Sequence, residues 1–375
     1  KGRPYAVCSS AMRVHVTTKT LVGAVSHLER IVPGRSSNPG LSYVRIRIAD
    51  DSVTLTGTNM EIDIEARLSA DAEGSGTWAV PGHVLAQVVR ALPGDTTELE
   101  FGESELRINS GGYDTKLQLV DVDQAPLVSF PDEFPGRLPA DIFTRILSSV
   151  RYAAAANDYQ AVFRGLRVEL HDGHSRAIAS DGFRLAWYHS DETSGLDSDI
   201  ILPARAVDEL SRLLDSGEVG LRIDNSQLSL ESANYRLNVK LMEGTFPDYQ
   251  RVIPKVFPVE ITTSAAGLIE AVSRVAVLSD AGANNRIDLF IEGGKLTITS
   301  EGSFGGAIES LTVQQGGTEE QLSLSYNARY LLDAVKPLSG DVRITFSGSQ
   351  TPSIVHGVSE AGYLAMIGPL KTGAD

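Results

Sequence analysis

The residues that come closest to a reactive arrangement are two histidines and one serine. His171 and His174 flank the turn sequence Asp172-Gly173, and two imidazoles so close together could bind a metal ion. Neither a cysteine nor a third ligand stands near them, so a polar turn is the better interpretation. The segment Glu301-Gly302-Ser303-Phe304-Gly305 departs from the nucleophile elbow Gly-x-Ser-x-Gly, because Glu301 stands at the position of the first glycine.

Other catalytic and cofactor signatures are missing from the sequence. It has no Gly-x-x-x-x-Gly-Lys phosphate loop, no Gly-x-Gly-x-x-Gly after a strand, and no His-Glu-x-x-His zinc motif. The one cysteine, Cys8, has no partner in the chain, which excludes an internal disulfide and suits a reducing cytoplasm. We therefore expect no reaction, no cofactor and no metal ion. A hydrolase that uses scattered carboxylates is the remaining enzymatic alternative.

Length and charge restrict the other functions. A chain of 375 residues with 42% hydrophobic residues is long enough for two or three globular domains. No apolar run is long enough to span a membrane, and the first residues lack the apolar core of a signal peptide. Met12 is a candidate start, with residues 1–11 as an extension before it. The net charge of −15 argues against nucleic-acid binding through charge alone.

The chain repeats one order of elements three times. Pro81, Pro203 and Tyr326 stand at equivalent positions, 122 and 123 residues apart, each at the start of a strand–helix–strand pattern. Apolar residues at helical spacing predict two helices per repeat, over 17–31, 81–91, 141–153, 203–215, 264–278 and 326–336. Alternating segments between them predict about eight strands per repeat, with tight turns at 49–51, 172–173 and 293–294. Proline-rich joins at 123–139 and 247–258 then divide the chain into three α+β domains, 12–130, 136–255 and 258–370, each with two helices packed on antiparallel sheets.

Three segments of the chain resemble the beta subunit of bacterial DNA polymerase III, the DNA sliding clamp, and the resemblance runs from Met12 to Leu370. The segments are Ala179-Ser180-Asp181-Gly182-Phe183-Arg184-Leu185-Ala186, Glu243-Gly244-Thr245-Phe246-Pro247-Asp248-Tyr249-Gln250-Arg251-Val252-Ile253-Pro254 and Asn327-Ala328-Arg329-Tyr330-Leu331-Leu332-Asp333. The resemblance implies a head-to-tail homodimeric ring with pseudo-sixfold symmetry, the DNA clamp fold. Such a ring encircles duplex DNA, confers processivity on the replicative polymerase, serves other clients with short hydrophobic peptide motifs, and is opened by an ATP-dependent clamp loader. It catalyses nothing, works in the cytoplasm and has no membrane partner.

The helices suit such a ring in number and in charge. Twelve helices about 9 Å apart span roughly 110 Å, which leaves a hole of roughly 25 Å, wide enough for a DNA duplex. The six expected helices carry ten Lys or Arg and seven Asp or Glu, so they are at +3 while the rest of the chain is at −18. Exposed basic residues on ordinary helix faces are the alternative interpretation. Tandem modules that form a scaffold without DNA are the rival function.

The resemblance also implies three sets of functional residues. A pocket for client peptides is expected on the second and third repeats, at Phe163, Ser180, Gly182, Phe183, Arg184, Leu185, Pro247, Arg251, Val252, Leu364, Ala365 and Met366. Arg184 and Arg251 would bind polar groups of the peptide, and Met366 would adapt to different clients. DNA contacts are expected from the loop residues Arg35, Asn157, Tyr159 and Gln160, with a simple surface turn as the alternative. Arg205 and Arg212 are added because their seven-residue spacing places them on one helix face. Ring closure is expected from Thr115 and Leu117 against Val277 and Leu278 of a second copy, with core packing as the alternative.

The chain departs from the family after Met366. Many clamps end there in a Met-Pro-x-Arg type of tail, whereas Ile367-Gly368-Pro369-Leu370 and five further residues follow here.

Overall fold

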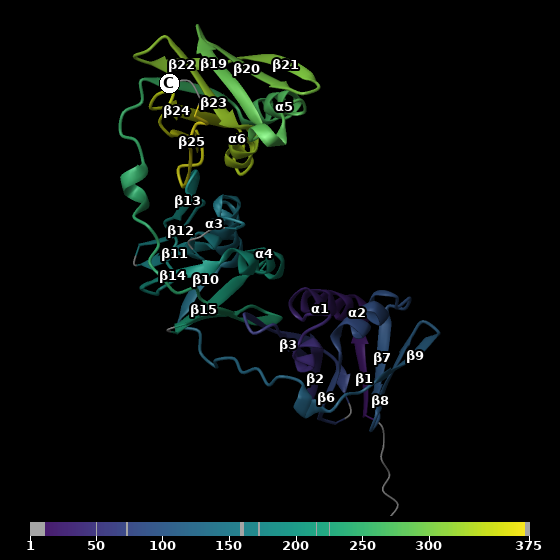
Figure 1. Ribbon diagram of the computed structural model, residues 1–375. Coiled ribbons are helices and arrows are strands. Elements are labelled where there is room, and N and C mark those ends of the chain that lie inside the picture. The colour runs from purple at the N-terminus through teal and green to yellow at the C-terminus, as the bar shows by residue number, and fades with distance from the viewer. Residues whose placement is uncertain are drawn as a thin grey trace, which may run out of the picture. The chain divides into compact units, whose positions relative to one another are not determined.

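The computed structural model describes residues 12–49, 51–72, 74–157, 161–171, 173–214, 216–224 and 226–371. Helices and antiparallel sheets form two compact units (Figure 1). Unit 1 holds the described residues of Lys1–Asp141 and Glu209–Leu241, and unit 2 holds those of Ile142–Asp208 and Met242–Asp375. The boundary between the units passes through two helices, α3 (Ala140–Ser148) and α4 (Ala204–Leu213).

Unit 1 contains two sheets. The five-stranded sheet has the order β5 (Asp71–Ala72), β1 (Met12–Thr17), β7 (Thr96–Phe101), β8 (Glu105–Ser110) and β9 (Tyr113–Gln118). The eight-stranded sheet has the order β10 (Gly136–Pro139), β15 (Glu218–Asp224), β16 (Gln227–Glu231), β17 (Tyr235–Lys240), β4 (Ile62–Ser69), β3 (Ser52–Thr58), β2 (Tyr43–Ala49) and β6 (Gly76–Pro81).

Two helices cover these sheets because their apolar residues recur on one face. Helix α1 (Thr18–Ile31) buries Leu21, Val25 and Leu28, at the spacing of one helical stripe, and α2 (Gly82–Arg90) buries Leu85 and Val89 in the same way. The two helices pack on each other, and α1 also packs on β3 and β4 (Figure 1). The apolar periodicity of the sequence therefore predicted both helices correctly.

Unit 2 also contains two sheets. The nine-stranded sheet has the order β14 (Ser198–Pro203), β11 (Gly165–His171), β12 (His174–Ser180), β13 (Arg184–Ser190), β26 (Tyr363–Ile367), β25 (Ser353–Gly357), β24 (Asp341–Phe346), β18 (Val259–Ser264) and β22 (Gln314–Gly317). The four-stranded sheet has the order β21 (Gly305–Thr312), β20 (Lys295–Gly302), β19 (Arg286–Glu292) and β23 (Gln321–Asn327).

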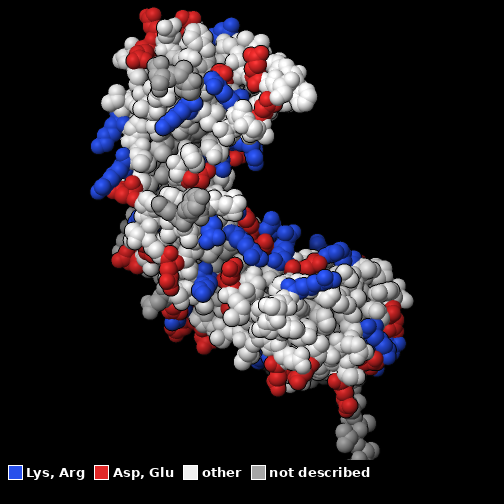
Figure 2. Space-filling view, viewed as in Figure 1, with Lys and Arg blue, Asp and Glu red and all other residues white. Residues whose placement is uncertain are grey.

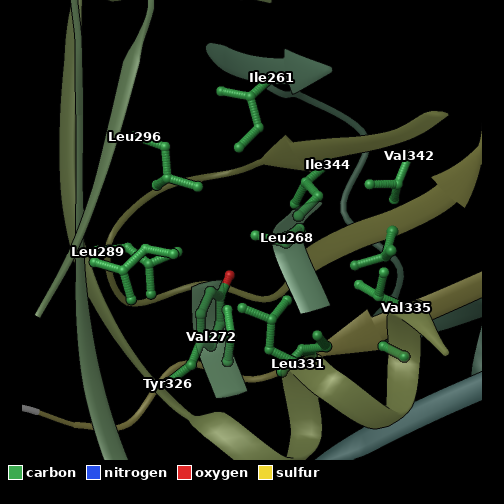
Figure 3. Close-up of a cluster of buried hydrophobic side chains, with 14 of the residues drawn as sticks. Ile261, Leu268, Val272, Leu289, Leu296, Tyr326, Leu331, Val335, Val342 and Ile344 are labelled. Atoms are coloured by element: carbon green, nitrogen blue, oxygen red, sulfur yellow. The ribbon is translucent and has the colours of Figure 1, made fainter. Parts of the chain in front are cut away.

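The main core of unit 2 lies between its sheets and two further helices, α5 (Ala265–Ala276) and α6 (Ala328–Val335). Figure 3 shows Leu268 and Val272 of α5 close to Leu331 of α6, with Leu289 and Ile344 contributed by the sheets. Each of these side chains is at most 1% exposed. Truncation of one of them to alanine would cost about 2–5 kcal/mol, so this core holds the helices in place.

One expected helix is shorter than its sequence pattern predicted. The segment 141–153 was expected to be helical throughout, but α3 ends at Ser148 and a 3-10 turn, η3 (Arg151–Ala153), follows it. Leu147, Val150 and Ala153 are all buried at a spacing of three residues, which is the period of a 3-10 helix. These side chains therefore stay buried although the α-helix ends at Ser148.

The sheets cross the expected domain boundaries. Strand β17 pairs with β4, and β13 pairs with β26, so strands of the second repeat complete sheets of the first and of the third. The arrangement of helices on antiparallel sheets is as expected. Sharing strands between repeats was not predicted. The turn at Gly293-Gly294 was predicted correctly, since both residues have positive φ (58° and 76°) and join β19 to β20 as a tight hairpin.

No helix in the described part of the chain is long and apolar enough to cross a membrane.

Candidate binding pocket

Unit 2 contains a cavity of about 1110 Å³. Most of its wall comes from three segments distant in sequence: the chain after η3, the turn between β12 and β13, and the start of α6. Phe163 of η4 (Ala161–Arg164) and Asn285, just before β19, complete it. Its lining residues are Ala154, Ala155, Ala156, Asn157, Phe163, Asp181, Gly182, Phe183, Arg184, Asn285, Asn327, Arg329, Tyr330 and Asp333. Apolar surface and a few polar groups together are typical of a site for a peptide or a small molecule.

The turn between β12 and β13 holds Phe183 at the edge of this cavity. The Asp181 carboxylate accepts hydrogen bonds from the backbone N–H groups of Phe183 (2.9 Å) and Arg184 (3.0 Å). The Ser180 hydroxyl accepts from Gly182 N–H (3.1 Å) and donates to the Arg184 carbonyl (2.8 Å). Gly182 has φ of +86°, a backbone conformation that side chains strongly disfavour. Phe183 consequently stands 70% exposed, with its ring available to a ligand.

The side chain of Arg184 connects this turn to α6. Its Nε donates to Asp181 Oδ2 (3.0 Å) and its NH1 group donates to Asp333 Oδ2 (2.8 Å). The guanidinium also lies over the rings of Tyr330 and Tyr152, at 4.3 Å and 5.3 Å from their centroids. Burial lowers the pKa of Arg184, but the two carboxylates outweigh this effect and leave the pKa raised. The guanidinium of Arg184 is thus engaged by groups of the wall itself, and its expected role in binding a peptide's polar groups stays a prediction.

Two tyrosines, Tyr152 and Tyr363, form a second connection to α6. The hydroxyls of Tyr152 and Tyr363 are 2.7 Å apart, and Tyr363 donates to the carbonyl of Ala334 in α6, also at 2.7 Å. Burial raises the pKa of both phenols, so both remain neutral at any physiological pH. This chain of hydrogen bonds ties η3, β26 and α6 together beneath the cavity.

An apolar cluster continues beside the pocket. Leu185 and Met366, paired across β13 and β26, are 2% and 8% exposed and pack with Ile178, Ile201, Phe246, Tyr249 and Ile354. Phe163 and Leu364 lie half-buried against this cluster, and Val252 is 51% exposed. Pro247 and Arg251 are exposed, with Arg251 paired to Asp248 at 2.8 Å. Ala365 is fully buried in the core between α5 and α6, so its expected place in the pocket is wrong.

Three family models match consecutive parts of the chain. They describe the N-terminal domain of the DNA polymerase III beta subunit (residues 12–129), its central domain (137–248) and its C-terminal domain (250–371). The chain belongs to the DNA polymerase III beta subunit family. Curated relatives of this family include the beta sliding clamps of Bacillus subtilis, 24% identical over 96% of this chain and 100% of the relative, and of Caulobacter vibrioides, 28% identical with the same coverage.

Solved structures of the beta-subunit family have the same fold. A sliding clamp of Pseudomonas aeruginosa bound to griselimycin matches with a TM-score of 0.89 at 26% identity, covering 96% of this chain and 100% of that one. The beta subunit of Thermotoga maritima matches with a TM-score of 0.88 at 25% identity and the same coverage. The DNA clamp fold expected from the sequence is thereby confirmed.

Some residues of the pocket were missed by the sequence analysis. Tyr330 and Asp333 stand in the segment that carried the family resemblance, yet they were not assigned to the site. Asn157 was expected to contact DNA, and the structure places it in the pocket wall. Tyr159 and Gln160 lie outside the described residues.

The three arginines expected to contact DNA are exposed. Arg35 is exposed in the loop after α1, and Arg205 and Arg212 are exposed on α4, with Arg212 3.1 Å from Glu209. Figure 2 shows Lys and Arg gathered over α1 and over α4. Their contact with DNA stays a prediction.

The residues expected at ring closure differ in exposure. Thr115 is half-buried in β9, an edge strand, and Leu117 is only 6% exposed, so its side chain belongs to the core of its own sheet. Val277 is 78% exposed just after α5, and Leu278 is half-buried. Two residues at the edge strand β21 are also exposed but were not assigned to ring closure from the sequence: Phe304 before the strand (94% exposed) and Ile308 within it (72% exposed).

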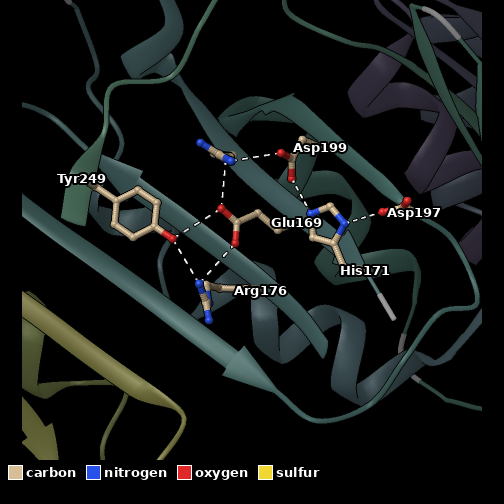
Figure 4. Close-up of polar contacts among 7 residues, drawn as sticks. Glu169, His171, Arg176, Asp197, Asp199 and Tyr249 are labelled. Atoms are coloured by element: carbon tan, nitrogen blue, oxygen red, sulfur yellow. Dashed lines mark hydrogen bonds and ion pairs between the residues drawn. The ribbon is translucent and has the colours of Figure 1, made fainter. Parts of the chain in front are cut away.

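Of the two histidines, His171 belongs to a polar network on β11 and β12 (Figure 4), and the His174 ring lies 5.6 Å from it. His171 contacts Asp197 through Nδ1 (2.6 Å) and Asp199 through Nε2 (3.0 Å). Close by, the buried Glu169 accepts from Arg176 (3.3 Å) and from the hydroxyl of Tyr249 (3.4 Å). Within the described ranges no group of three His, Cys, Asp or Glu is placed to hold a metal ion. Both nitrogens of His171 are already occupied by carboxylates.

Proposed function

We propose that this chain is a DNA sliding clamp without chemistry of its own. Two copies form a head-to-tail ring around duplex DNA in the cytoplasm, and an ATP-dependent loader opens the ring. The observation that carries the proposal is the match of all three beta-subunit domains, in order, over nearly the whole chain. Relatives named sliding clamps align with 96% of this chain and with their own full length, which supports the same function here.

Two free strand edges support the homodimer. Strand β9 ends the five-stranded sheet of unit 1, and β21 ends the four-stranded sheet of unit 2. The exposed Phe304 and Ile308 lie in or next to the second edge, and the exposed Val277 follows α5, which packs against β21. Large apolar side chains beside an unpaired edge are costly in water, and a second copy that pairs with this edge would remove them from it.

Substitution of Ile308 tests this interface. We expect Ile308→Glu to convert the dimer to monomer, measured by sedimentation velocity over a range of protein concentrations. Phe290→Glu is the matched control, because Phe290 is 41% exposed on the inner strand β19 of the same sheet. A wild-type chain that stays monomeric at every concentration, or an Ile308→Glu variant as dimeric as the wild type, would contradict the proposed closure.

Retention on DNA tests the clamp itself. The ring, loaded onto closed circular DNA by a bacterial loader, should remain bound in a salt wash and leave when the circle is cut. Negative-stain images of the protein alone should show closed six-lobed rings. Extended three-lobed particles, together with no retention on circular DNA, would favour the tandem scaffold instead.

The pocket is the proposed site for the replicative polymerase and other clients. Phe163 and Phe183 offer aromatic surface, and a relative with the same fold is described as bound to griselimycin. We expect Phe183→Ser to weaken an apolar client peptide about tenfold or more, since an exposed ring of this size buries much area on binding. Arg251→Ala with Met366→Ala should weaken it too, but the buried Met366 would also destabilise unit 2 by about 2–5 kcal/mol. Unchanged affinity in Phe183→Ser would refute this assignment.

A further inference from the structure

The 3-10 turn η5 (Tyr249–Val252) carries Arg251 and Val252, two exposed residues expected in the client pocket. Within this turn only Tyr249 is buried. Its side chain is 5% exposed and packs in the apolar cluster beside the cavity, whereas the residues on either side of it are exposed. The position of η5 on unit 2 therefore depends on what holds the Tyr249 side chain.

The Tyr249 hydroxyl contacts two charged side chains of the sheet beneath it (Figure 4). It accepts from the NH1 group of Arg176 on β12 (3.1 Å) and donates to Oε1 of Glu169 on β11 (3.4 Å). The NH1 group of Arg176 also donates to the second oxygen of Glu169 (3.3 Å). The phenol, the guanidinium and the carboxylate thus form a closed triangle of hydrogen bonds, which fixes the hydroxyl as both donor and acceptor.

This triangle is an unusual way to attach a turn, because a buried carboxylate is costly unless charged partners compensate it. Glu169 is 7% exposed, and Arg167 Nε lies 3.0 Å from it as a second cation. The Arg176 guanidinium lies over the ring of Trp187 on β13, 5.5 Å from its centroid, and Tyr249 meets the same ring edge-on at 5.7 Å. Apolar residues could fill this space at less cost, so the charges here serve to fix an orientation.

We propose that Arg176 and Glu169 are positioning residues of the client pocket, which set the η5 turn through the Tyr249 hydroxyl. This inference rests on the proposed client pocket and adds residues that touch no peptide, since neither of the two lines the cavity. Each acts on Tyr249, and the place of Tyr249 decides where Arg251 and Val252 stand. Binding residues whose supporting contacts are lost can shift by about 1 Å, which is enough to weaken a site.

The test uses the full chain and a fluorescein-labelled heptapeptide with Leu and Phe anchors, whose affinity is measured by fluorescence anisotropy. We expect Tyr249→Phe and Arg176→Met each to weaken binding about threefold to tenfold, because each removes hydrogen bonds that hold the turn. The double variant should lose no more than Tyr249→Phe alone, since Arg176 acts through the hydroxyl. Arg176→Lys, which keeps a charged donor, should restore most of the affinity.

Tyr188→Phe is the matched control. Tyr188 lies on β13 of the same unit, and its hydroxyl forms no hydrogen bond with any residue that the structure describes. This variant should bind the peptide as the wild type does. Trp187 reports on the turn in a Trp78→Phe background: acrylamide should quench its fluorescence more strongly in Tyr249→Phe, but not in Tyr188→Phe.

Two results would overturn the inference while leaving the client pocket intact. One is wild-type peptide affinity in both Tyr249→Phe and Arg176→Met. The other is a pair of losses that add in the double variant, with Trp187 quenched as in the wild type, because the two residues would then act independently of the turn. Failure of the wild type to bind the peptide would overturn both proposals.

Discussion

Removing the charge of Asp333 should loosen the wall of the pocket. The Asp333 carboxylate lies 2.8 Å from the NH1 group of Arg184, and the two side chains are 26% and 13% exposed. A hydrogen bond between charged groups contributes about 1.5–3 kcal/mol. In Asp333→Asn the amide oxygen still accepts, and Arg184 keeps Asp181, so we expect a loss of about 1–2 kcal/mol. The exposed contact with Lys336 adds little.

The two tryptophans allow this loss to be assigned to one unit. Trp78 belongs to unit 1 and stacks on Phe101, whereas Trp187 belongs to unit 2 and lies three residues after Arg184. In a Trp78→Phe background, which keeps the aromatic stack, tryptophan fluorescence reports only unit 2. Urea titration of this background with and without Asp333→Asn then gives the difference in the free energy of unfolding.

Asp341→Asn is the matched control, since Asp341 is exposed in the same unit and its carboxylate forms no ion pair in the described part of the chain. It should change the free energy of unfolding by less than about 0.5 kcal/mol. If Asp333→Asn lowers the free energy of unfolding no more than this control, the ion pair between Arg184 and Asp333 contributes nothing to stability. The account of Arg184 as a structural residue then fails.

Three further substitutions test other parts of the site. Tyr363→Phe should lower the free energy of unfolding by about 2–3 kcal/mol in the same urea assay, and Tyr152→Phe by about 1 kcal/mol. Only Tyr363→Phe leaves two buried groups, the Tyr152 hydroxyl and the Ala334 carbonyl, without their hydrogen bond. The reverse order would refute the direction of the hydrogen-bond chain. The hydrogen bond to Asp197 raises the pKa of His171, although burial lowers it. The protonated imidazole therefore stabilises the fold fully below about pH 6.5, and this stabilisation is lost as pH rises through the raised pKa. The stability gap between wild type and His171→Gln should accordingly narrow from about pH 6 to about pH 8.5, and a constant gap would exclude this linkage. Gly182→Ala should cost about 1–2 kcal/mol through backbone strain alone, since an added Cβ would meet no atom within 4 Å; an unchanged urea midpoint would show that φ can relax there.

The helices of this fold were predictable because their apolar stripes are local. The spacing of Leu21, Val25 and Leu28 predicts α1 without any information from the rest of the chain. The pairing of β17 with β4 has no such local signal, because paired residues such as Tyr235 and Ala66 are more than one repeat apart in the sequence. An alternating strand indicates which of its faces is buried, but it does not identify the strand at its edge.

The pocket was predictable to a similar extent. The motif around Gly182 marked the turn, but the partner of Arg184 is 149 residues away, so no spacing rule could identify Asp333. Ala365 could have been excluded from the sequence alone. In a strand, neighbouring side chains point to opposite faces, so Ala365 must face away from Met366.

The pairing of β17 with β4 and of β13 with β26 also limits how such a protein can change in evolution. The sequence repeats about every third of the chain, but removing the central third would leave β4 and β26 each without one paired strand. A recombination event that replaced the central repeat would have to supply two complementary edges at once. Repeats of this kind can diverge in place, as the 24–28% identity to relatives indicates, but they cannot readily be shuffled.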